Sequence, residues 1–284
     1  MWPWWYTMVA VNMTQVAVCL RLFRQSLQAP DARSSYVQWM RIMGLVFTVV
    51  ACYRAIFVSR YLYQYAWFDT VLNSSLLIRT MAACAEISFS CLIAFAMLRF
   101  NKDAPGKQQP SNPSMAFVRN RSPYALIACI VLAQFFATAG LITKSRLAFA
   151  IEESLWGLGF LSILPLAFVQ CLRVIRSGNE FADKRMSMLR TFAFVNFGWC
   201  LLYCTYSLVY HLPTEYWATA LEQFETGIPA LKSGFSAVTD ALLVVNVTHD
   251  YEDWGFGFVF WHSCYFTVCV WLALFLMRAP RAGP

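Results

Sequence analysis

Seven stretches of mainly apolar residues are the feature that most constrains how this chain can fold. A helix needs about 20 such residues to cross roughly 30 Å of hydrocarbon. The stretches are residues 3–23, 41–62, 71–98, 123–143, 150–175, 187–211 and 256–277. Lipid offers no hydrogen-bond partner to an unpaired backbone group, so each stretch is expected to be helical. The pattern predicts an all-α polytopic membrane protein, a seven-transmembrane-helix bundle forming one domain over residues 1–284.

The composition supports a chain that faces the lipid bilayer. Hydrophobic residues make up 59% of the sequence and charged residues 13%. A soluble domain usually carries roughly 25% charged residues, because it needs polar surface over its core. All ten cysteines fall inside the apolar stretches, where thiols behave as small hydrophobes. A disulfide framework is therefore not expected.

The basic residues alternate from one side of the predicted membrane to the other and so predict an orientation. Sixteen of the 22 fall on one side: Arg21, Arg24, Arg33, Arg41, Arg99, Lys102, Lys107, Arg119, Arg121, Arg173, Arg176, Lys184, Arg185, Arg190, Arg278 and Arg281. Lysine and arginine are enriched in cytosolic loops. We therefore expect the N-terminus outside or in a lumen and the C-terminus in the cytosol. The net charge of +7 reflects this bias, and no nucleic-acid partner is expected.

Two long connections follow from this topology, a cytosolic loop at 99–122 and an outer loop at 212–255. Within the outer loop, residues 228–247 are moderately apolar and allow two interpretations. An eighth span would place Lys232 and Asp240 at lipid depth, where charge is costly. An interfacial or re-entrant segment before the last helix is therefore the preferred interpretation.

Charged residues inside the predicted spans are candidate functional residues. Arg79 and Glu86 lie seven positions apart in the third span, so they share one helix face about 10.5 Å apart. Arg54 lies at a similar outer depth in the second span. An ionised group inside a membrane usually faces a partner or a wet cavity. The pattern favours a polar site in which Glu86 carries a proton or meets a cationic group, while Arg54 and Arg79 hold an anionic group.

A structural interpretation of these charges is equally consistent with the sequence. Glu86 and an arginine would form an interhelical ion pair that fixes packing. Alternatively, a protonated Glu86 would be hydrogen-bonded to Asn12, Gln15 or Gln134.

Glu152 and Glu153 stand near the predicted start of the fifth helix. Acidic side chains at a helix N-terminus are stabilised by the helix dipole, which is sufficient to explain them. They also lie on the acidic outer side, so a ligand-binding role is retained as an alternative.

Histidines and carboxylates gather before and within the last span. His249, Asp250, Asp253 and His262 are the candidate metal ligands, because imidazole and carboxylate groups bind divalent metals. Their spacing matches no established metal motif. Solvated loop carboxylates and interfacial histidines are therefore the favoured interpretation.

The resulting hypothesis is a membrane protein that binds or transports a small polar or amphipathic molecule, with proton coupling through Glu86. Two alternatives remain: an integral-membrane enzyme with an outward-facing His/Asp site, and a non-catalytic subunit that needs partner chains. The sequence specifies neither a cofactor nor a particular membrane.

Overall fold

The computed structural model describes residues 1–61, 63–104, 113–177 and 181–282, and within them the chain is an all-α bundle. Seven helices in these ranges are long and apolar enough to cross a membrane. They are Trp2–Leu27 (α1), Ser35–Ile56 (α2), Ser75–Asp103 (α3), Val118–Thr143 within α4 (Pro113–Thr143), Arg146–Arg176 (α5), Ser187–Thr226 and Tyr251–Met277. The sequence prediction of a seven-helix polytopic bundle is confirmed.

The last two long helices consist of several segments. The sixth joins α7 (Ser187–Tyr206), the π-helix η3 (Ser207–Trp217) and α8 (Ala218–Thr226). The seventh joins α10 (Tyr251–Cys264), the π-helix η4 (Tyr265–Cys269) and α11 (Val270–Met277). A short 3₁₀ turn, η2 (Lys184–Met186), precedes α7.

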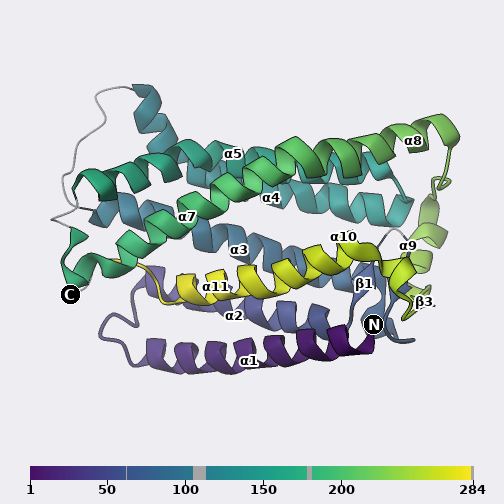
Figure 1. The fold of residues 1–284 in the computed structure, drawn as a ribbon, viewed down its shortest axis with the longest axis horizontal. Coiled ribbons are helices and arrows are strands. Elements are labelled where there is room, and N and C mark those ends of the chain that lie inside the picture. The colour runs from purple at the N-terminus through teal and green to yellow at the C-terminus, as the bar shows by residue number, and fades with distance from the viewer. Residues whose placement is uncertain (62, 105–112, 178–180, 283–284) are drawn as a thin grey trace.

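All seven helices run along the long axis of the molecule (Figure 1). The chain starts at the end that carries the small sheet, here termed the N-terminal end, and α11 finishes at the opposite or C-terminal end. Helix α3 is central, because it packs against α2 and α4 and also contacts α5, α7 and α11. Groups on α3 can therefore reach partners on several helices.

Several helix boundaries differ from the apolar stretches for local reasons. Helix α2 begins and ends six residues before the expected span, because the backbone is extended at Ser34 and the chain turns into a strand after Phe57. Helix α5 begins four residues early, at Arg146, because the Ser145 side chain accepts a hydrogen bond from the Ala148 amide.

Both expected loops are partly helical. Helix α3 continues to Asp103 and α4 starts at Pro113, so helix occupies much of 99–122; residues 105–112 lie outside the described residues. On the other side, the sixth helix continues past residue 211 to Thr226. A π-helical segment accommodates Pro213, which lacks a backbone donor, and Gly227 ends the helix with a φ of 69°. Hydropathy missed both extensions because their residues are more polar.

The segment before the last helix forms α9 (Gly234–Leu243), which packs against α3 and α4. Its ten residues span about 15 Å, half the hydrocarbon thickness. It is therefore too short to be an eighth span.

A small cap closes the N-terminal end. Strands β1 (Ser59–Arg60) and β2 (Tyr65–Ala66) pair antiparallel, and β3 (Asn246–Val247) joins β2 in parallel. The 3₁₀ turn η1 (Val71–Asn73) then leads into α3. Trp67 and Trp254 are fully buried beneath this sheet with Val58. The cap includes the connection between α2 and α3, the two helices that carry Arg54, Arg79 and Glu86.

A close helix contact holds α2 against α11. A Cβ atom at Gly44 would lie 2.8 Å from the Cβ and 2.9 Å from the Cγ of Met277. Small residues permit such approach between membrane helices.

A buried ion cluster in the bundle

Five side chains from four helices form a buried ion cluster in the part of the bundle nearer the cap. Its members are Arg54 of α2, Arg79 and Glu86 of α3, Gln134 of α4 and Glu152 of α5. Exposure is 7% for Arg54, 3% for Arg79, 6% for Glu86, 8% for Gln134 and 6% for Glu152. The two guanidinium and two carboxylate groups balance in charge, which lowers the cost of their burial.

Arg79 is the centre of the cluster. Its Nη2 donates to Oε2 of Glu86 at 2.7 Å, and its Nη1 donates to Oε1 at 3.2 Å. Nη1 also lies 3.4 Å from Oε1 of Glu152, and Nη2 donates to Oε1 of Gln134. The planar guanidinium suits this fork of two parallel bonds to one carboxylate. Arg79 thus links α3 to α4 and α5.

Arg54 is held more loosely than Arg79. Its Nη2 donates to the hydroxyl of Tyr61 at 2.9 Å, while its Nη1 lies 3.8 Å from Oε1 of Glu86. That separation exceeds a hydrogen bond, and this buried Nη1 has no hydrogen-bond partner within the described residues. The guanidinium also lies 5.1 Å from the ring centre of Phe266 and 5.8 Å from that of Tyr265. Arg54 therefore retains a free donor that points into the protein interior.

Glu152 and Glu153 have different environments although they are adjacent. Glu152 turns into the cluster, whereas Glu153 is half-buried and faces Tyr216 of η3. Because α5 begins at Arg146, neither residue is in the first turn. The helix-dipole explanation therefore does not apply, and the ion pair with Arg79 accounts for the burial of Glu152.

The amides considered as partners of Glu86 have other roles. Gln134 belongs to the cluster but bonds to Arg79, and its amide nitrogen donates to the Ile130 carbonyl at 2.9 Å. Asn12 donates to the Met8 carbonyl, and Gln15 donates to the Thr267 carbonyl. Glu86 is thus paired most closely with Arg79 of its own helix, and its interhelical contact is the longer one of 3.8 Å to Arg54 of α2.

The structure does not bring His249, Asp250, Asp253 and His262 together. The Nε2 of His249 lies 3.0 Å from the Trp67 carbonyl oxygen, and its ring stacks on Trp2. His262 is buried among aromatic rings, 4.3 Å from the ring centre of Phe266. Within the described residues, no three His, Cys, Asp or Glu side chains are placed to hold a metal ion together.

A second polar group lies near the cap and includes Asp240 of α9. Lys232 and Asp240 form an ion pair of 2.8 Å, and Gln64 donates to the Asp240 carboxylate at 3.1 Å. These hydrogen bonds and the lysine charge outweigh burial and hold the pKa of Asp240 below its ordinary value. Nearby, Lys144 is buried in the turn between α4 and α5. Burial, only partly offset by Asp240, lowers its pKa to about 8.

Sequence reasoning missed Tyr61 as a member of the site. Tyr61 lies in the turn between β1 and β2, next to the residues of the cap. Nothing in its sequence context indicates that this turn folds back over α2. The tyrosine hydroxyl is nevertheless the hydrogen-bond acceptor of Arg54 and connects the cluster to the cap.

Comparisons with protein-family models, with curated proteins and with solved structures give no match. The class of this chain therefore rests on its own fold and composition. Its seven apolar helices, within the described ranges, are those of a multi-pass integral membrane protein.

Proposed function

We propose that this multi-pass membrane protein binds and transports a small polar or amphipathic molecule at the ion cluster. The observation that carries the proposal is the buried Arg54 Nη1, which has no hydrogen-bond partner among the described residues and lies 3.8 Å from Glu86. A buried donor without an acceptor costs about 1–3 kcal/mol. A carboxylate or phosphate oxygen of a ligand would satisfy it.

The arrangement supports exchange of partners at Glu86. Glu86 bonds to Arg79 and faces Arg54. An anionic ligand group would replace Glu86 beside Arg54, while a proton taken up by Glu86 would keep the cluster neutral. Arg79 retains Glu152 and Gln134 throughout, so the helices stay connected. Glu86 is therefore the proposed proton carrier, and Arg54 is the proposed ligand anchor.

We also propose that the cluster opens to the non-cytosolic side. The concentration of lysine and arginine at the opposite end of the bundle supports this orientation. Tyr61, which accepts a hydrogen bond from Arg54, is half-buried in the cap and stands between the cluster and that side. The proposed entry path thus passes the β1–β2 turn.

One observation favours a second candidate function, a non-catalytic subunit with a structural clamp. The two-bond pairing joins Arg79 directly to Glu86 at the centre of the cluster. In this alternative the cluster fixes helix packing, and the exposed apolar helix faces meet partner chains in the membrane.

A ligand panel with Arg54→Gln distinguishes these functions. Arg54 is the appropriate site because its removal leaves the bonds between Arg79 and Glu86 in place. The purified protein would be tested by thermal unfolding against monocarboxylates, dicarboxylates, amino acids, phosphate esters and amines. The proposal predicts that at least one anionic class stabilises the wild type and not Arg54→Gln. Glu225→Gln, an exposed charge change on α8, serves as the control and should respond like the wild type.

Two results would contradict binding at the cluster. One is an anionic compound that stabilises the wild type and Arg54→Gln equally. The other is an unresponsive wild type across all five classes, which would favour the structural clamp.

A further inference from the structure

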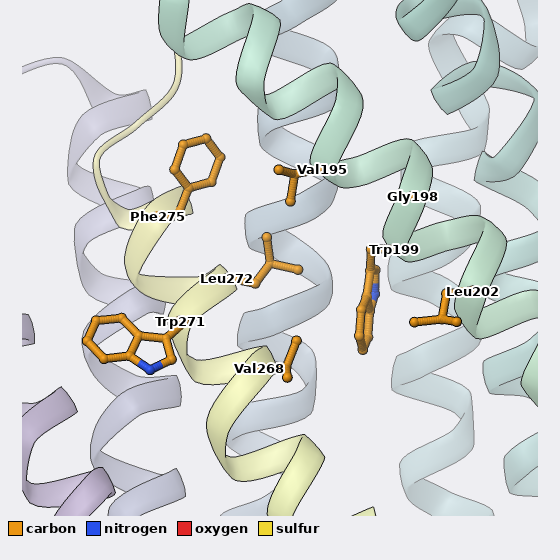
Figure 2. A pocket seen from close by; sticks show the side chains of 8 residues that line it. All are labelled: Val195, Gly198, Trp199, Leu202, Val268, Trp271, Leu272 and Phe275. Atoms are coloured by element: carbon orange, nitrogen blue, oxygen red, sulfur yellow. The ribbon is translucent and has the colours of Figure 1, made fainter.

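Two hollows on the surface of the bundle differ in the chemistry of their walls. The larger one lies between α7 and the η4–α11 segment and is lined by apolar and aromatic side chains, among them Val195, Trp199 and Trp271 (Figure 2). The smaller one has a volume of about 180 Å³ and lies at the C-terminal end, where α1, α2 and α11 meet. Charged side chains line this second hollow, here termed the C-terminal pocket, so its walls can select a ligand by charge.

The C-terminal pocket is apolar where it is buried and polar where it is exposed. Val37 of α2 and Met277 of α11 are 2% and 1% exposed, and they line it together with Leu22 of α1. Gln25 of α1 and Arg278, which follows α11, are exposed. The volume equals that of about six water molecules at roughly 30 Å³ each, which is enough room for a phosphate group.

Two arginines line the pocket, and one of them retains its charge without a partner. The Nε of Arg281 lies 2.7 Å from Oδ2 of Asp31, and its Nη2 donates to Oδ1 at 2.8 Å. Its Nη1 donates to the Ala279 carbonyl at 2.7 Å. The Arg278 side chain, by contrast, makes no hydrogen bond or ion pair within the described part of the chain, and no acidic residue lines the pocket there. The pocket therefore carries a net positive charge whose donors have no protein acceptor.

The chain after α11 is fixed in place, so the pocket is a defined part of the fold. Ala279 has a φ of 54°, a left-handed conformation that residues other than glycine rarely adopt, and it turns the chain toward the α1–α2 connection. The Tyr36 hydroxyl donates to the Pro280 carbonyl at 2.9 Å, and the Ala282 amide donates to the Asp103 carboxylate at 3.1 Å. These contacts with α2 and α3 hold both arginines at the pocket.

A further guanidinium with unpaired donors lies next to the pocket. Arg41 follows Val37 by one turn on the same face of α2 and is 9% exposed. Its Nε and Nη1 are buried and have no hydrogen-bond partner among the described residues. The guanidinium lies 5.3 Å from the ring centre of Phe23, the neighbour of Leu22 in α1. The positive potential of the pocket is thus reinforced from the protein interior, where charge is screened less than at the surface.

We propose that the C-terminal pocket binds a phosphate group, presented by an anionic lipid or by a free phosphate ester, with Arg278 as its principal contact. A guanidinium offers two parallel donors that match the oxygens of a phosphate. The Gln25 amide has no side-chain partner in the described residues and supplies a further donor. Basic pockets between membrane-spanning helices hold anionic headgroups in this way. The site lies at the opposite end of the bundle from the cap and does not rest on the proposed transport function.

Native mass spectrometry of the detergent-purified full chain tests the proposal. The probes are phosphatidylglycerol and phosphatidylcholine with identical acyl chains, and soluble glycerol phosphate as the free ester. The proposal predicts that the first phosphatidylglycerol binds about fivefold more tightly than phosphatidylcholine, or that glycerol phosphate binds the wild type. In either case Arg278→Gln should weaken that binding about fivefold, because it removes the charge that attracts the phosphate.

Two further variants make the result specific. Arg190→Gln is the matched control, because it removes an exposed arginine at the same end of the bundle but outside the pocket, and it should bind like the wild type. Arg278→Lys keeps the positive charge and should retain most of the affinity, which separates the loss of charge from a loss of folding. Each variant is first checked by size-exclusion chromatography.

The pattern of binding identifies the source of the phosphate. A preference for phosphatidylglycerol that glycerol phosphate does not displace indicates a lipid, whereas binding of glycerol phosphate that depends on Arg278 indicates a soluble ester. The proposal is overturned if neither probe binds more weakly to Arg278→Gln than to Arg190→Gln. Repeating the ligand panel of the ion cluster in the Arg278→Gln background keeps the two proposals separate.

Discussion

Replacing Glu86 by glutamine should reveal how the buried charges depend on one another. The change keeps the shape of the side chain but removes the carboxylate that bonds to Arg79 at 2.7 and 3.2 Å and faces Arg54 at 3.8 Å. The cluster then carries one excess positive charge in an apolar bundle. Arg79 keeps Glu152, whereas Arg54 loses the one carboxylate with which it pairs among the described residues.

The magnitude follows from these contacts. Removing one partner of a buried pair costs about 3–5 kcal/mol. Because Arg79 retains Glu152 and Gln134, we expect the lower end, a loss of about 3 kcal/mol in unfolding free energy for Glu86→Gln. Arg54→Gln alone should cost about 1 kcal/mol, since Glu86 keeps both bonds to Arg79. The double variant restores charge balance and should lose about 2 kcal/mol, less than the sum of the two single changes.

The assay is reversible unfolding by sodium dodecyl sulfate in mixed micelles, with Glu225→Gln as an exposed control. A coupling near 2 kcal/mol between the two positions is the expected outcome of the cycle. Additive losses, or a double variant less stable than Glu86→Gln, would refute the claim that Arg54 and Glu86 compensate each other. A Glu86→Gln protein as stable as the wild type would show that the carboxylate is not ionised in the folded state.

Two further predictions concern packing and pH. Gly44→Ala should lose about 1–3 kcal/mol of unfolding free energy, because its Cβ would overlap Met277. Gly198→Ala is the control and should lose nothing, because a Cβ at that position meets no atom within 4 Å. Equal effects of the two substitutions in the same unfolding assay would contradict the close contact between α2 and α11. Lys144 has a folded-state pKa of about 8, below the ordinary value of 10.5, so its charged form is disfavoured by folding and stability should rise between pH 8 and 10.5. Lys144→Met should therefore have a higher unfolding free energy than the wild type at pH 7, and this difference should shrink by pH 10. A difference in unfolding free energy that stays constant between pH 7 and pH 10 would contradict the lowered pKa of Lys144.

The number and order of the helices could be predicted from the sequence because crossing a bilayer imposes length and apolarity on each span. The close relation of Arg79 and Glu86 could be predicted for a similar reason, since seven residues on one helix return to the same face. Similar outer depth in neighbouring spans related Arg54 to Arg79, and it did not indicate the contact between Arg54 and Glu86. These inferences depend on geometry within one helix or on position along the membrane normal.

Contacts set by tertiary packing could not be predicted in this way. Which of two adjacent glutamates enters the cluster depends on the rotation of α5, and the sequence does not reveal that rotation. Gln134 was considered as a partner of Glu86, but the bundle places it against Arg79. Tyr61 depends on a short turn that folds back over the helix bundle. The continuation of the sixth helix through Pro213 likewise needed a π-helical segment, which apolar length does not signal.

The most direct measurement for the central claim is a cryo-electron-microscopy structure of the full chain in lipid nanodiscs, at a resolution that shows side chains and ordered water. The proposed function predicts non-protein density or ordered water at Arg54 Nη1, within hydrogen-bond distance and continuous with a path past Tyr61. A closed, dry cluster in which both arginines contact only protein groups would contradict a binding site there. The cluster would then be a structural clamp.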